Sequence, residues 1–496
     1  MSFGQNSPPS GTIRTWLDLR SLSNEVAFTF PDGEEDLTWS DLHKCARSIA
    51  YDLTAKNIQK GESVAIMYPN CREAVLAIYG VLYGGFRATM INLVAGPDAI
   101  SYALEHSDAR FALVHESVIS LFSDTKSEVI TALDLNLNAP QADLHFIIAA
   151  DHALLMYTSG TTGRPKGVVH SHSSLLAGGW TTVIAHELCD TDRGFCLLPV
   201  YHINGVCVTL MGALVSGGSL AMCTKFSASR FWQNAKKAQI NWFSVVPTIV
   251  SHLLHGEHEP DEATKLRIRF GRSASSALAP DVQSAFEKRF GIPIVETMGL
   301  TETAAQILSN PLPPGIRKIG SPGIAYGNEV GVMNVKFRPC DPNVEGEIVV
   351  RGPNVMLEYL KNPEATRDSF KDGWLRTGDL GRMDEDGYIF VTGRLKELII
   401  KGGENIAPRE IDEALYSHPD VVEAAAFSVK CSRYGETVEA AVKLSEGSKV
   451  IEADLQEICL KKLGSFKRPD KVHILNDLPK GPSGKIQRGK ISALLP

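Results

Sequence analysis

The sequence lacks the features that mark several special classes of protein. Its nine cysteines are scattered, and none has the Cys-x-x-Cys spacing of a zinc site, so we expect reduced thiols. Its 50 basic and 57 acidic residues leave a net charge of −7, which does not indicate the basic face of a nucleic-acid-binding protein. The start of the chain has no apolar core of a signal peptide, and its last three residues are no peroxisomal signal. We therefore expect a cytoplasmic protein without nucleic-acid partners.

The sequence also has little that could cross a membrane. One stretch, residues 206–223, carries no charged residue and is nearly long enough for a transmembrane helix. Gly212 and the pair Gly217-Gly218 interrupt it, so a buried helix, a turn and a short strand are the simpler prediction. With 496 residues, 44% of them hydrophobic and 22% charged, the chain is long enough for two or more ordinary domains.

Apolar strand-like runs alternate with helical patterns along the chain, which is typical of a parallel sheet with helices on both faces. Strands are predicted at residues 63–67, 88–92, 109–115, 242–246 and 268–271, and helices at 40–54, 72–83, 99–107 and 280–290. Ser40 is the expected N-cap of the first helix. Residues 124–150 have no clear pattern and are expected to form a loop. Near Val330 the pattern changes to short strands with turns, and beyond Arg394 a compact α/β segment follows.

A loop rich in glycine and hydroxyl side chains follows the apolar run 153–157. It contains Thr158, Ser159, Gly160, Thr161, Thr162, Gly163 and Lys166. Its glycines let backbone N–H groups approach a polyphosphate, its hydroxyls can donate to phosphate oxygens, and Lys166 adds a positive charge. Gly167 stands where a Walker A loop has its Mg²⁺-binding hydroxyl, and a strand follows instead of a helix, so this is not a Walker A loop. Alone, the stretch could equally be a hydrophilic hairpin tip.

Two further motifs carry groups suited to a nucleotide. In Glu296-Thr-Met-Gly-Leu-Thr-Glu302, Thr301 can hydrogen-bond a phosphate and Glu302 is a carboxylate that could hold Mg²⁺. Alone, this motif could be an ordinary helix start with Thr301 as its cap. In Trp374-Leu-Arg-Thr-Gly-Asp-Leu-Gly381, Asp379 could accept from both hydroxyls of a ribose, or it could simply mark a turn.

The last two motifs lie toward the C-terminus. Residues 393–405 combine cationic side chains with the pair Gly402-Gly403, and we interpret them as a hinge between domains. Residues 478–488 form a glycine-rich basic segment in which Gly484 precedes Lys485. This segment is either a solvated basic tail or a mobile turn that presents a lysine.

Together, these five segments resemble the adenylate-forming superfamily, which includes acyl-CoA synthetases, firefly luciferase and the adenylation domains of peptide synthetases. The match runs from about Thr38 to Arg488, with the motifs in the order and spacing of the family. The resemblance implies an α/β fold in which residues 1–394 form a large N-terminal domain of two doubly wound sheets, with a β-barrel-like subdomain at about 325–394. Residues 395–496 would form a small mobile C-terminal domain that swings about a hinge at Lys396.

The resemblance also implies the chemistry of an ATP-dependent acid:CoA ligase with Mg²⁺. A carboxylate attacks the α-phosphate of ATP, pyrophosphate leaves, and CoA then attacks the acyl-AMP and releases AMP. In this resemblance Lys485, Thr301 and Glu302 are catalytic, Glu302 binds Mg²⁺, and the glycine-rich loop holds the leaving phosphates. The other nucleotide-binding residues that it implies are Ser275, Ser276, Glu296, Thr297, Met298, Asp379 and Arg394. Gly402 and Gly403 would lie beside the pantetheine arm of CoA in the second step.

The identity of the acid is harder to predict. The resemblance places His202, Arg272 and Ser273 at the acyl pocket, although His202 could instead be a structural histidine. Many relatives have a Gly-Ala-Ala-Pro-like run where this chain has Ser273, Ser275 and Ser276 after Arg272. A polar floor with a cation suits a small acid with a second anionic group and would leave polar groups unpaired against an alkyl chain. Segments 229–232, 309–313 and 483–488 are similar to those of ligases for oxalate, sulfoacetate and other short polar acids.

Other functions stay open at this point. The chain could load the phosphopantetheine of a separate carrier protein, or it could activate short or medium fatty acids or aromatic acids. A non-enzymatic nucleotide-binding protein is disfavoured, because Glu302, Asp379, Arg394 and Lys485 all stand where the motifs of the superfamily place them. The oligomeric state cannot be predicted from the sequence.

Overall fold

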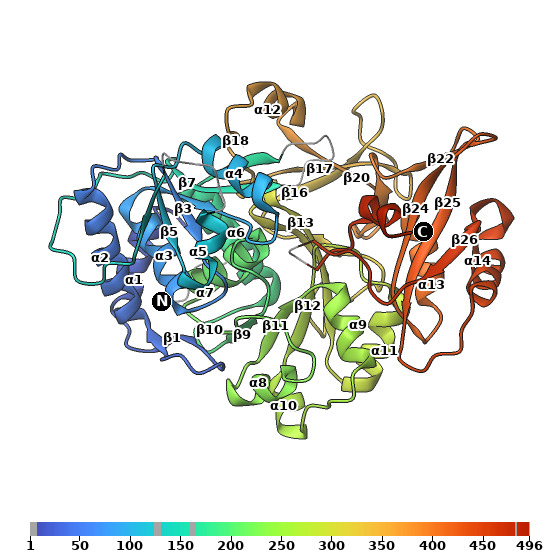
Figure 1. Cartoon of the computed structure of the whole chain (residues 1–496), viewed down its shortest axis with the longest axis horizontal. Helices are drawn as coiled ribbons and strands as arrows, with labels where there is room; N and C mark the ends of the chain where they lie inside the picture. The colour runs from blue at the N-terminus through green and yellow to red at the C-terminus, as the bar shows by residue number, and fades with distance from the viewer. Residues whose placement is uncertain (1–6, 124–129, 159–164, 482–483, 496) are drawn as a thin grey trace.

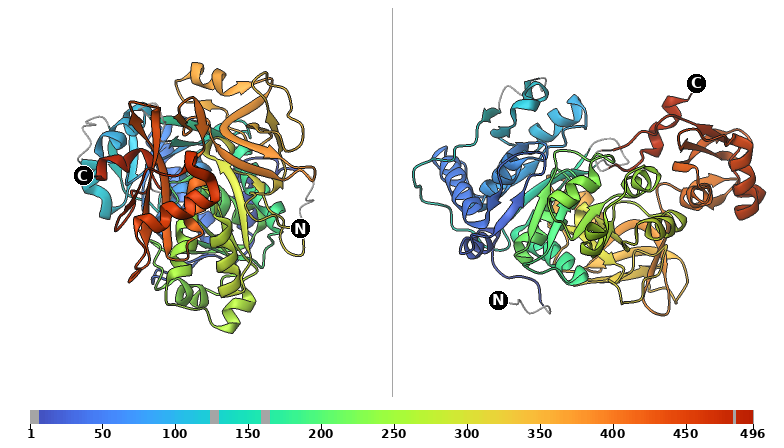
Figure 2. Two further views of the ribbon diagram at one scale, coloured as in Figure 1. Left: turned by 90° about the vertical axis from the view of Figure 1, so that its right-hand side faces the viewer. Right: turned by 90° about the horizontal axis from the view of Figure 1, so that it is seen from below.

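The computed structural model describes residues 7–123, 130–158, 165–481 and 484–495. The described residues form four β-sheets with helices around them (Figure 1). Three sheets lie in the large part of the molecule, and the fourth lies at one side with the C-terminus (Figure 2). This mixed α/β architecture confirms the predicted fold class.

The first sheet has seven strands, of which the central ones are parallel. In spatial order they are β18 (Glu358–Tyr359), β8 (Lys166–Ser171), β7 (His152–Thr158), β4 (Arg87–Met90), β3 (Ser63–Met67), β5 (Phe111–Val114) and β6 (Thr131–Leu133). The side chains of β3 alternate between two separate hydrophobic clusters, with Val64 and Ile66 in one and Ala65 and Met67 in the other. A strand covered on both faces in this way is an uninterrupted apolar run, which explains the pattern in the sequence.

The second sheet has nine strands and carries much of the candidate site. In spatial order they are β15 (Ile324–Ala325), β14 (Ala305–Ser309), β13 (Ile294–Leu300), β12 (Phe270–Ser273), β11 (Trp242–Val245), β9 (Arg193–Cys196), β10 (Ser219–Met222), β1 (Val26–Thr29) and β2 (Leu37–Thr38). The strands from β1 to β13 are parallel, so their carboxyl ends meet at one edge of the sheet. Ligands of open α/β sheets bind at such an edge.

The third and fourth sheets are smaller and mainly antiparallel. The third contains β16 (Glu329–Met333), β17 (Gly346–Arg351), β20 (Trp374–Met383), β19 (Phe370–Lys371) and β21 (Ile389–Arg394). The fourth contains β23 (Glu404–Ile406), β22 (Ile399–Lys401), β25 (Gly435–Leu444), β24 (Val421–Cys431) and β26 (Lys471–Ile474). The predicted domain boundary at residues 394 and 395 falls between these two sheets and stays a prediction.

Helices cover the sheets and pack closely on one another. They are α1 (Ile13–Arg20), α2 (Trp39–Ala55), α3 (Arg72–Gly84), α4 (Pro97–His106), α5 (Ile119–Ser123), α6 (His172–His186), α7 (Gly212–Ser216), α8 (Phe231–Lys237), α9 (Pro247–His255), α10 (Glu262–Arg267), α11 (Pro280–Phe290), α12 (Pro363–Ser369), α13 (Pro408–Tyr416) and α14 (Glu452–Lys467). Gly80 allows α2 and α3 to meet, because a Cβ at this position would lie 2.5 Å from Ile49 Cγ2.

The structure corrects two details of the sequence prediction. Thr38, not Ser40, is the N-cap of α2, because its hydroxyl accepts the Asp41 N–H at 3.0 Å and the helix begins at Trp39. The stretch predicted as a loop at 124–150 contains the short strand β6, which pairs in parallel with β5. Neighbouring strands can recruit such a segment without a pattern of its own, since β propensity depends strongly on context.

The uncharged stretch 206–223 is a buried part of the globular fold. It contains a π-helical segment (Asn204–Met211), then α7, a turn at Gly217 with φ +82°, and β10. This order confirms the predicted helix, turn and strand. Within the described ranges, no helix is long and apolar enough to cross a bilayer.

Candidate functional site

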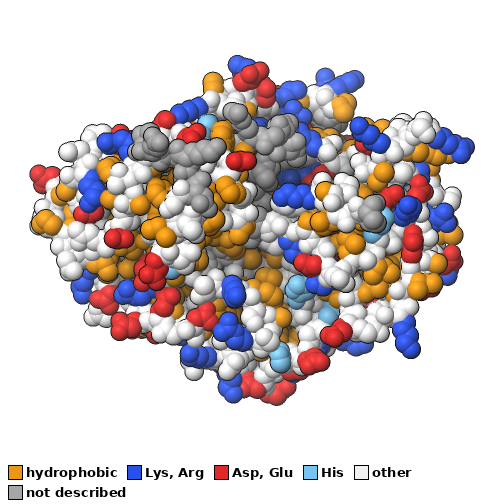
Figure 3. Space-filling model, in the orientation of Figure 1, with side chains coloured by type: hydrophobic (Ala, Val, Ile, Leu, Met, Phe, Trp, Pro, Cys, Tyr) orange, Lys and Arg blue, Asp and Glu red, His pale blue; other side chains and the backbone are white. Residues whose placement is uncertain are grey.

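Two adjoining cavities lie where the large part of the molecule meets the C-terminal sheet. The first cavity has a volume of about 200 Å³ and the second about 510 Å³. They share a wall that contains Ser275, Gly299, Arg394, Glu397 and Lys485. Lys and Arg side chains stand beside the hollow in the middle of the face drawn in Figure 3. The sequence of the shared wall spans more than two hundred residues, so only the fold brings these groups together.

Most of the predicted site residues line one of these cavities. Those at the first cavity are Ser275, Ser276, Glu296, Thr297, Met298, Asp379, Arg394 and Lys485. Those at the second cavity are Thr158, Lys166, His202, Arg272, Ser275, Thr301, Glu302, Arg394, Lys396 and Lys485. Residues from five separate motifs thus surround one continuous region.

Some predicted residues lie elsewhere. Ser273 lines neither cavity, because its side chain is fully buried in β12. Its hydroxyl has no hydrogen-bond partner among the described residues. Gly402 and Gly403 form the turn between β22 and β23 and also line neither cavity. The predicted phosphate-binding residues Ser159, Gly160, Thr161, Thr162 and Gly163 lie outside the described residues.

The second cavity contains a linked group of polar side chains near the end of β7. Tyr359 donates its hydroxyl to Glu302 Oε1 at 2.7 Å, and Lys166 Nζ lies 4.5 Å from the centre of the Tyr359 ring. His170 Nε2 donates to the backbone oxygen of Thr301 at 2.6 Å, which fixes the start of the short 3₁₀ turn that carries Glu302. Among the described residues, none hydrogen-bonds the other oxygen of Glu302. This oxygen-rich group suits a hard cation such as Mg²⁺.

Asp379 and Arg394 form an ion pair across two paired strands. They face each other in the register of β20 and β21, and Arg394 Nε donates to Asp379 Oδ1 at 2.5 Å. Burial would lower the pKa of Arg394, but the Asp379 charge outweighs it, and the pKa lies above its ordinary value. The backbone N–H of Asp379 donates to Thr377 Oγ1 at 3.1 Å, which fixes the main chain at the residue that carries the carboxylate.

Lys485 lies in a hairpin that the structure describes by the pairing of residues 479–481 with residues 485–487. Gly481 N donates to Lys485 O at 2.7 Å, and Gln487 N donates to Pro479 O at 2.8 Å. Burial, with help from the nearby Arg394 charge, lowers the pKa of Lys485. Gly484 has φ +79°, a backbone conformation that favours glycine, and a Cβ there would come within 3.0 Å of Val246 Cγ2.

Arg272 is a buried cation at the second cavity, and no acidic partner opposes it among the described residues. Its side chain is among the largest that are fully buried, and it donates only to neutral groups, Gln306 Oε1 at 3.3 Å and Ser244 Oγ at 3.2 Å. Burial lowers the pKa of Arg272 to about 9, and no described carboxylate opposes this shift. An uncompensated buried guanidinium is costly, so the cavity favours a ligand that brings a negative charge.

His202 adds a neutral donor to the same wall. Burial lowers its pKa to about 4, so the ring is uncharged at neutral pH. Its Nδ1 accepts the Asn204 N–H at 3.4 Å, which leaves the ring proton on Nε2. Asn204 also lines the cavity, and its side-chain oxygen accepts from the Ser244 hydroxyl at 3.1 Å. The structure therefore places a donor and an amide beside Arg272.

The first cavity has an acidic group at its base. Glu296 is 2% exposed, and burial raises its pKa to about 7. Its Oε1 accepts the Leu278 N–H at 3.1 Å, whereas its Oε2 has no partner among the described residues. A ligand with an amino or N–H group could satisfy this oxygen.

Sequence reasoning missed Tyr359, Asn204 and Glu397, all of which line the second cavity. Tyr359 lies in the two-residue strand β18, which pairs with β8, and no motif surrounds it. Asn204 stands two positions from the predicted His202, and Glu397 lies inside the segment 393–405, so its place beside predicted residues could have indicated each of them.

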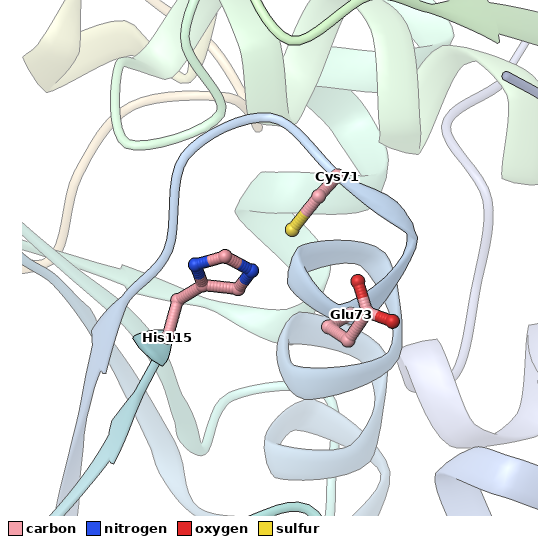
Figure 4. Close-up of side chains that lie close together, drawn as sticks. All are labelled: Cys71, Glu73 and His115. Atoms are coloured by element: carbon pink, nitrogen blue, oxygen red, sulfur yellow. The ribbon is translucent and has the colours of Figure 1, made fainter. Parts of the chain in front are cut away.

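A separate group of side chains lies away from both cavities. Cys71, Glu73 and His115 come together at the carboxyl ends of β3 and β5, with potential ligand atoms within 4.8 Å of one another (Figure 4). Burial raises the pKa of Cys71 to about 12, and His115 Nδ1 is bonded to the Ser117 hydroxyl at 2.7 Å. Ligands of one zinc ion lie about 3.5 Å apart, as follows from tetrahedral bonds of 2.0–2.3 Å, whereas the atoms of this group are spaced by up to 4.8 Å.

Comparisons with known proteins agree with this geometry. The family model of the AMP-binding enzyme matches residues 18–360, and that of the AMP-binding enzyme C-terminal domain matches residues 410–485. The chain belongs to the AMP-binding enzyme family. It is 42% identical over 476 residues to a sulfoacetate–CoA ligase of Cupriavidus necator, with 93% of each chain covered. It is 36% identical to an oxalate–CoA ligase of Arabidopsis thaliana, with 95% of this chain and 97% of that one covered.

A solved structure of a relative is known with and without nucleotide. ATP-bound MatB from Rhodopseudomonas palustris is 28% identical and superposes with a TM-score of 0.89, covering 97% of this chain and 99% of that one. Apo MatB, 27% identical and with 99% of each chain covered, superposes with a TM-score of 0.77. The present structure thus has the arrangement of the ATP-bound relative more than that of the apo form.

Proposed function

We propose that this AMP-forming acid:CoA ligase activates a short acid that carries a second anionic group, in the manner of sulfoacetate or oxalate. The enzyme class uses ATP, Mg²⁺ and CoA, and its first step forms an acyl-AMP. A carboxylate oxygen bonds to the α-phosphorus and pyrophosphate leaves with the electron pair of the broken bond. The CoA thiol then loses its proton and bonds to the acyl carbon, and AMP leaves.

Each group at the cavities suits one part of this chemistry. Asp379 would accept from the ribose hydroxyls, and Glu296 and its neighbours would surround the adenine. Lys485, on the wall shared by both cavities, would bind the attacking carboxylate and the α-phosphate together. The reaction concentrates negative charge on phosphate oxygens, so positively charged and N–H groups that are already in place stabilise the transition state. Glu302 would hold Mg²⁺, which neutralises phosphate charge.

The observation that carries the choice of acid is the buried Arg272. A second carboxylate or a sulfonate would supply the counter-charge that the described residues do not provide. His202 would donate a further hydrogen bond to the same group. An alkyl acid would leave Arg272 uncompensated, which disfavours it. The similarity to ligases named for sulfoacetate and oxalate supports the same choice.

A screen of acids tests the proposal directly. Pyrophosphate release should be measured with oxalate, malonate, sulfoacetate, acetate, butyrate, octanoate and coumarate, each with ATP, Mg²⁺ and CoA. Matched pairs sharpen the result, because 3,3-dimethylbutyrate has the shape of sulfoacetate without its second charge, and 3-methylbutyrate, added to the screen, has that of malonate. We expect the best acid to be dianionic and at least about tenfold faster than its matched monoanion. A monoanionic acid as the best substrate would contradict the proposal.

The acceptor can be tested in the same reaction. We expect free CoA to give a thioester, which thiol-specific detection and chromatography would show. A carrier protein with its phosphopantetheine is the alternative acceptor. Thioester formation with the carrier protein alone would overturn the proposed acceptor without changing the first step.

Asp379→Ala should mainly weaken the binding of ATP. The substitution removes a charged acceptor and leaves Arg394 without its partner, and hydrogen bonds to charged groups contribute about 1.5–3 kcal/mol. We therefore expect the Kd for ATP to rise about 10- to 100-fold in calorimetry. Glu329→Ala is the control, since it breaks an exposed Glu–Arg pair in the same sheet. An unchanged ATP affinity would count against the ribose role of Asp379.

We also propose that the protein works in the cytoplasm. All nine cysteines are free, as expected in a reducing compartment. Fractionation of cells with an antibody to the protein would test this location, and recovery from a membrane or secreted fraction would contradict it.

A further inference from the structure

Helix α9 of the large part of the molecule holds the C-terminal part through side-chain contacts. Three side chains of α9 donate to backbone oxygens of the C-terminal part, from Thr248 Oγ1 to Gly484 O (3.2 Å), from Ser251 Oγ to Val422 O (2.5 Å) and from His255 Nε2 to Pro419 O (3.0 Å). The first of these reaches the residue directly before Lys485. The other two reach β24 and the turn that precedes it. One helix therefore fixes both the C-terminal sheet and the hairpin of Lys485.

A fully buried carboxylate lies at the centre of this contact. Glu423 of β24 is 0% exposed, and its Oε1 accepts from His252 Nε2 of α9 at 2.9 Å. Its Oε2 lies 2.9 Å from Lys480 Nζ. Burial would raise the pKa of Glu423, but the contacts with His252 and Lys480 outweigh it, and the pKa lies below its ordinary value. The carboxylate is therefore charged, with a hydrogen bond from His252 at one oxygen and an ion pair with Lys480 at the other.

Lys480 connects this carboxylate to the lysine of the site. It stands on one arm of the hairpin and pairs with Ile486 on the other arm, the residue that follows Lys485. Asp477 Oδ1 accepts from Lys480 Nζ at 2.7 Å, so the ammonium group is held between two carboxylates. A change in the position of Lys480 would move the arm that carries Lys485.

We propose that Glu423 is a positioning residue that fastens the hairpin of Lys485 to α9 during adenylation. Its carboxylate contacts both His252 of the large part and Lys480 of the hairpin, so this one side chain links the two parts. The proposal rests on the role proposed above for Lys485. The two superpositions on MatB show that a relative adopts two arrangements. The contacts of Glu423 described here belong to the arrangement that resembles the ATP-bound form. The strength of these contacts would set how much of the enzyme is ready for the first step.

Two variants test the proposal, Glu423→Gln and His252→Asn. Glu423→Gln keeps the size of the side chain and removes its charge, and His252→Asn removes the ring nitrogen Nε2 that donates to Glu423. With the best acid of the screen, single-turnover pyrophosphate release should slow about tenfold, which corresponds to about 1.4 kcal/mol. Transfer of a pre-made acyl-AMP to CoA should be unchanged or faster, and the Kd for ATP should stay within about twofold. A general loss of structure would lower both steps together.

A matched control lies in the same sheet. Glu439 of β25 pairs with His473 Nε2 at 2.7 Å, entirely within the C-terminal part. Glu439→Gln removes the same kind of contact without touching α9, and both half-reactions should keep their wild-type rates. The double variant Glu423→Gln with His252→Asn should be no slower in adenylation than the slower single variant, because both break one contact.

Two results would contradict the positioning role of Glu423. One is adenylation at the wild-type rate in both Glu423→Gln and His252→Asn, and the other is an equal loss of both half-reactions. His252→Asn changes a residue whose side chain is 30% exposed, so it remains a test if Glu423→Gln does not fold. Lys485→Ala is run beside them. If Lys485→Ala adenylates at the wild-type rate, the proposed role of Lys485 is wrong. If Lys485→Ala loses adenylation but Glu423→Gln adenylates as fast as the Glu439→Gln control, only the positioning role of Glu423 is wrong.

Discussion

Lys485→Ala is expected to lose adenylation and to keep the transfer of a pre-made acyl-AMP to CoA. In the first step the ammonium group would bind both the attacking carboxylate and the α-phosphate, whereas the second step breaks no bond to phosphorus in the attack on the acyl carbon. Removing one such charged donor from a preorganised site lowers rates about 100- to 1,000-fold. Single-turnover assays of pyrophosphate release and of CoA transfer would measure the two steps separately.

The control for this experiment is Lys490→Ala, which removes an exposed lysine five positions further along the same terminal segment. It should leave both half-reactions within about twofold. Equal loss of both half-reactions in Lys485→Ala would show that the lysine supports the structure instead of the first step. The ATP affinity of Lys485→Ala, measured by calorimetry, should change less than that of Asp379→Ala.

Arg272→Met is expected to remove the preference for dianionic acids. Methionine nearly fills the space of the aliphatic part of arginine but cannot bind a sulfonate or a carboxylate. Truncating one partner of a buried charge pair costs about 2–5 kcal/mol, which is on the order of 100-fold or more in kcat/KM for the best dianionic acid. The matched monoanion, such as 3,3-dimethylbutyrate, should lose far less, because it never paired with the guanidinium.

Arg272→Lys is the control, because lysine keeps the positive charge but lacks the guanidinium group. It should recover part of the activity with the dianionic acid, although an ammonium cannot bind two oxygens side by side as a guanidinium does. Thermal unfolding should show Arg272→Met at least as stable as the wild type, since a buried cation without a counter-charge is costly. An equal loss for dianionic and monoanionic acids would mean that Arg272 only supports the fold.

The sequence predicted the regular parts of the fold well, because buried strands and helices have recognisable runs or periods of apolar residues. The strand at 63–67 and the helix at 280–290 were predicted at the bounds that β3 and α11 have. The start of α2 was misplaced by the choice of Ser40 over Thr38, because the intrinsic N-cap preference ranks serine above threonine. Strand β6 has no pattern of its own, and only its pairing with β5 defines it.

The candidate site was predicted to the extent that its residues stand in local motifs. Asp379 and Arg394 were named from separate motifs, and the register of β20 and β21 puts them opposite each other. Tyr359 could not be found, since the pairing of β18 with β8 brings it to Lys166 across nearly two hundred residues and its hydroxyl reaches Glu302, 57 residues away. The buried state of Arg272 and its lack of an acidic partner are properties of packing that no local pattern encodes.

The wall that the two cavities share has a consequence for inhibition. Because Ser275, Arg394 and Lys485 border both spaces, one molecule that joins an acid to an adenosine could occupy them at the same time. Such a molecule would gain the contacts of two ligands while it loses translational freedom only once. A stable sulfamoyl analogue of the acyl-adenylate should therefore bind far more tightly than either half, and the charge of its acid end would report on Arg272 without any turnover.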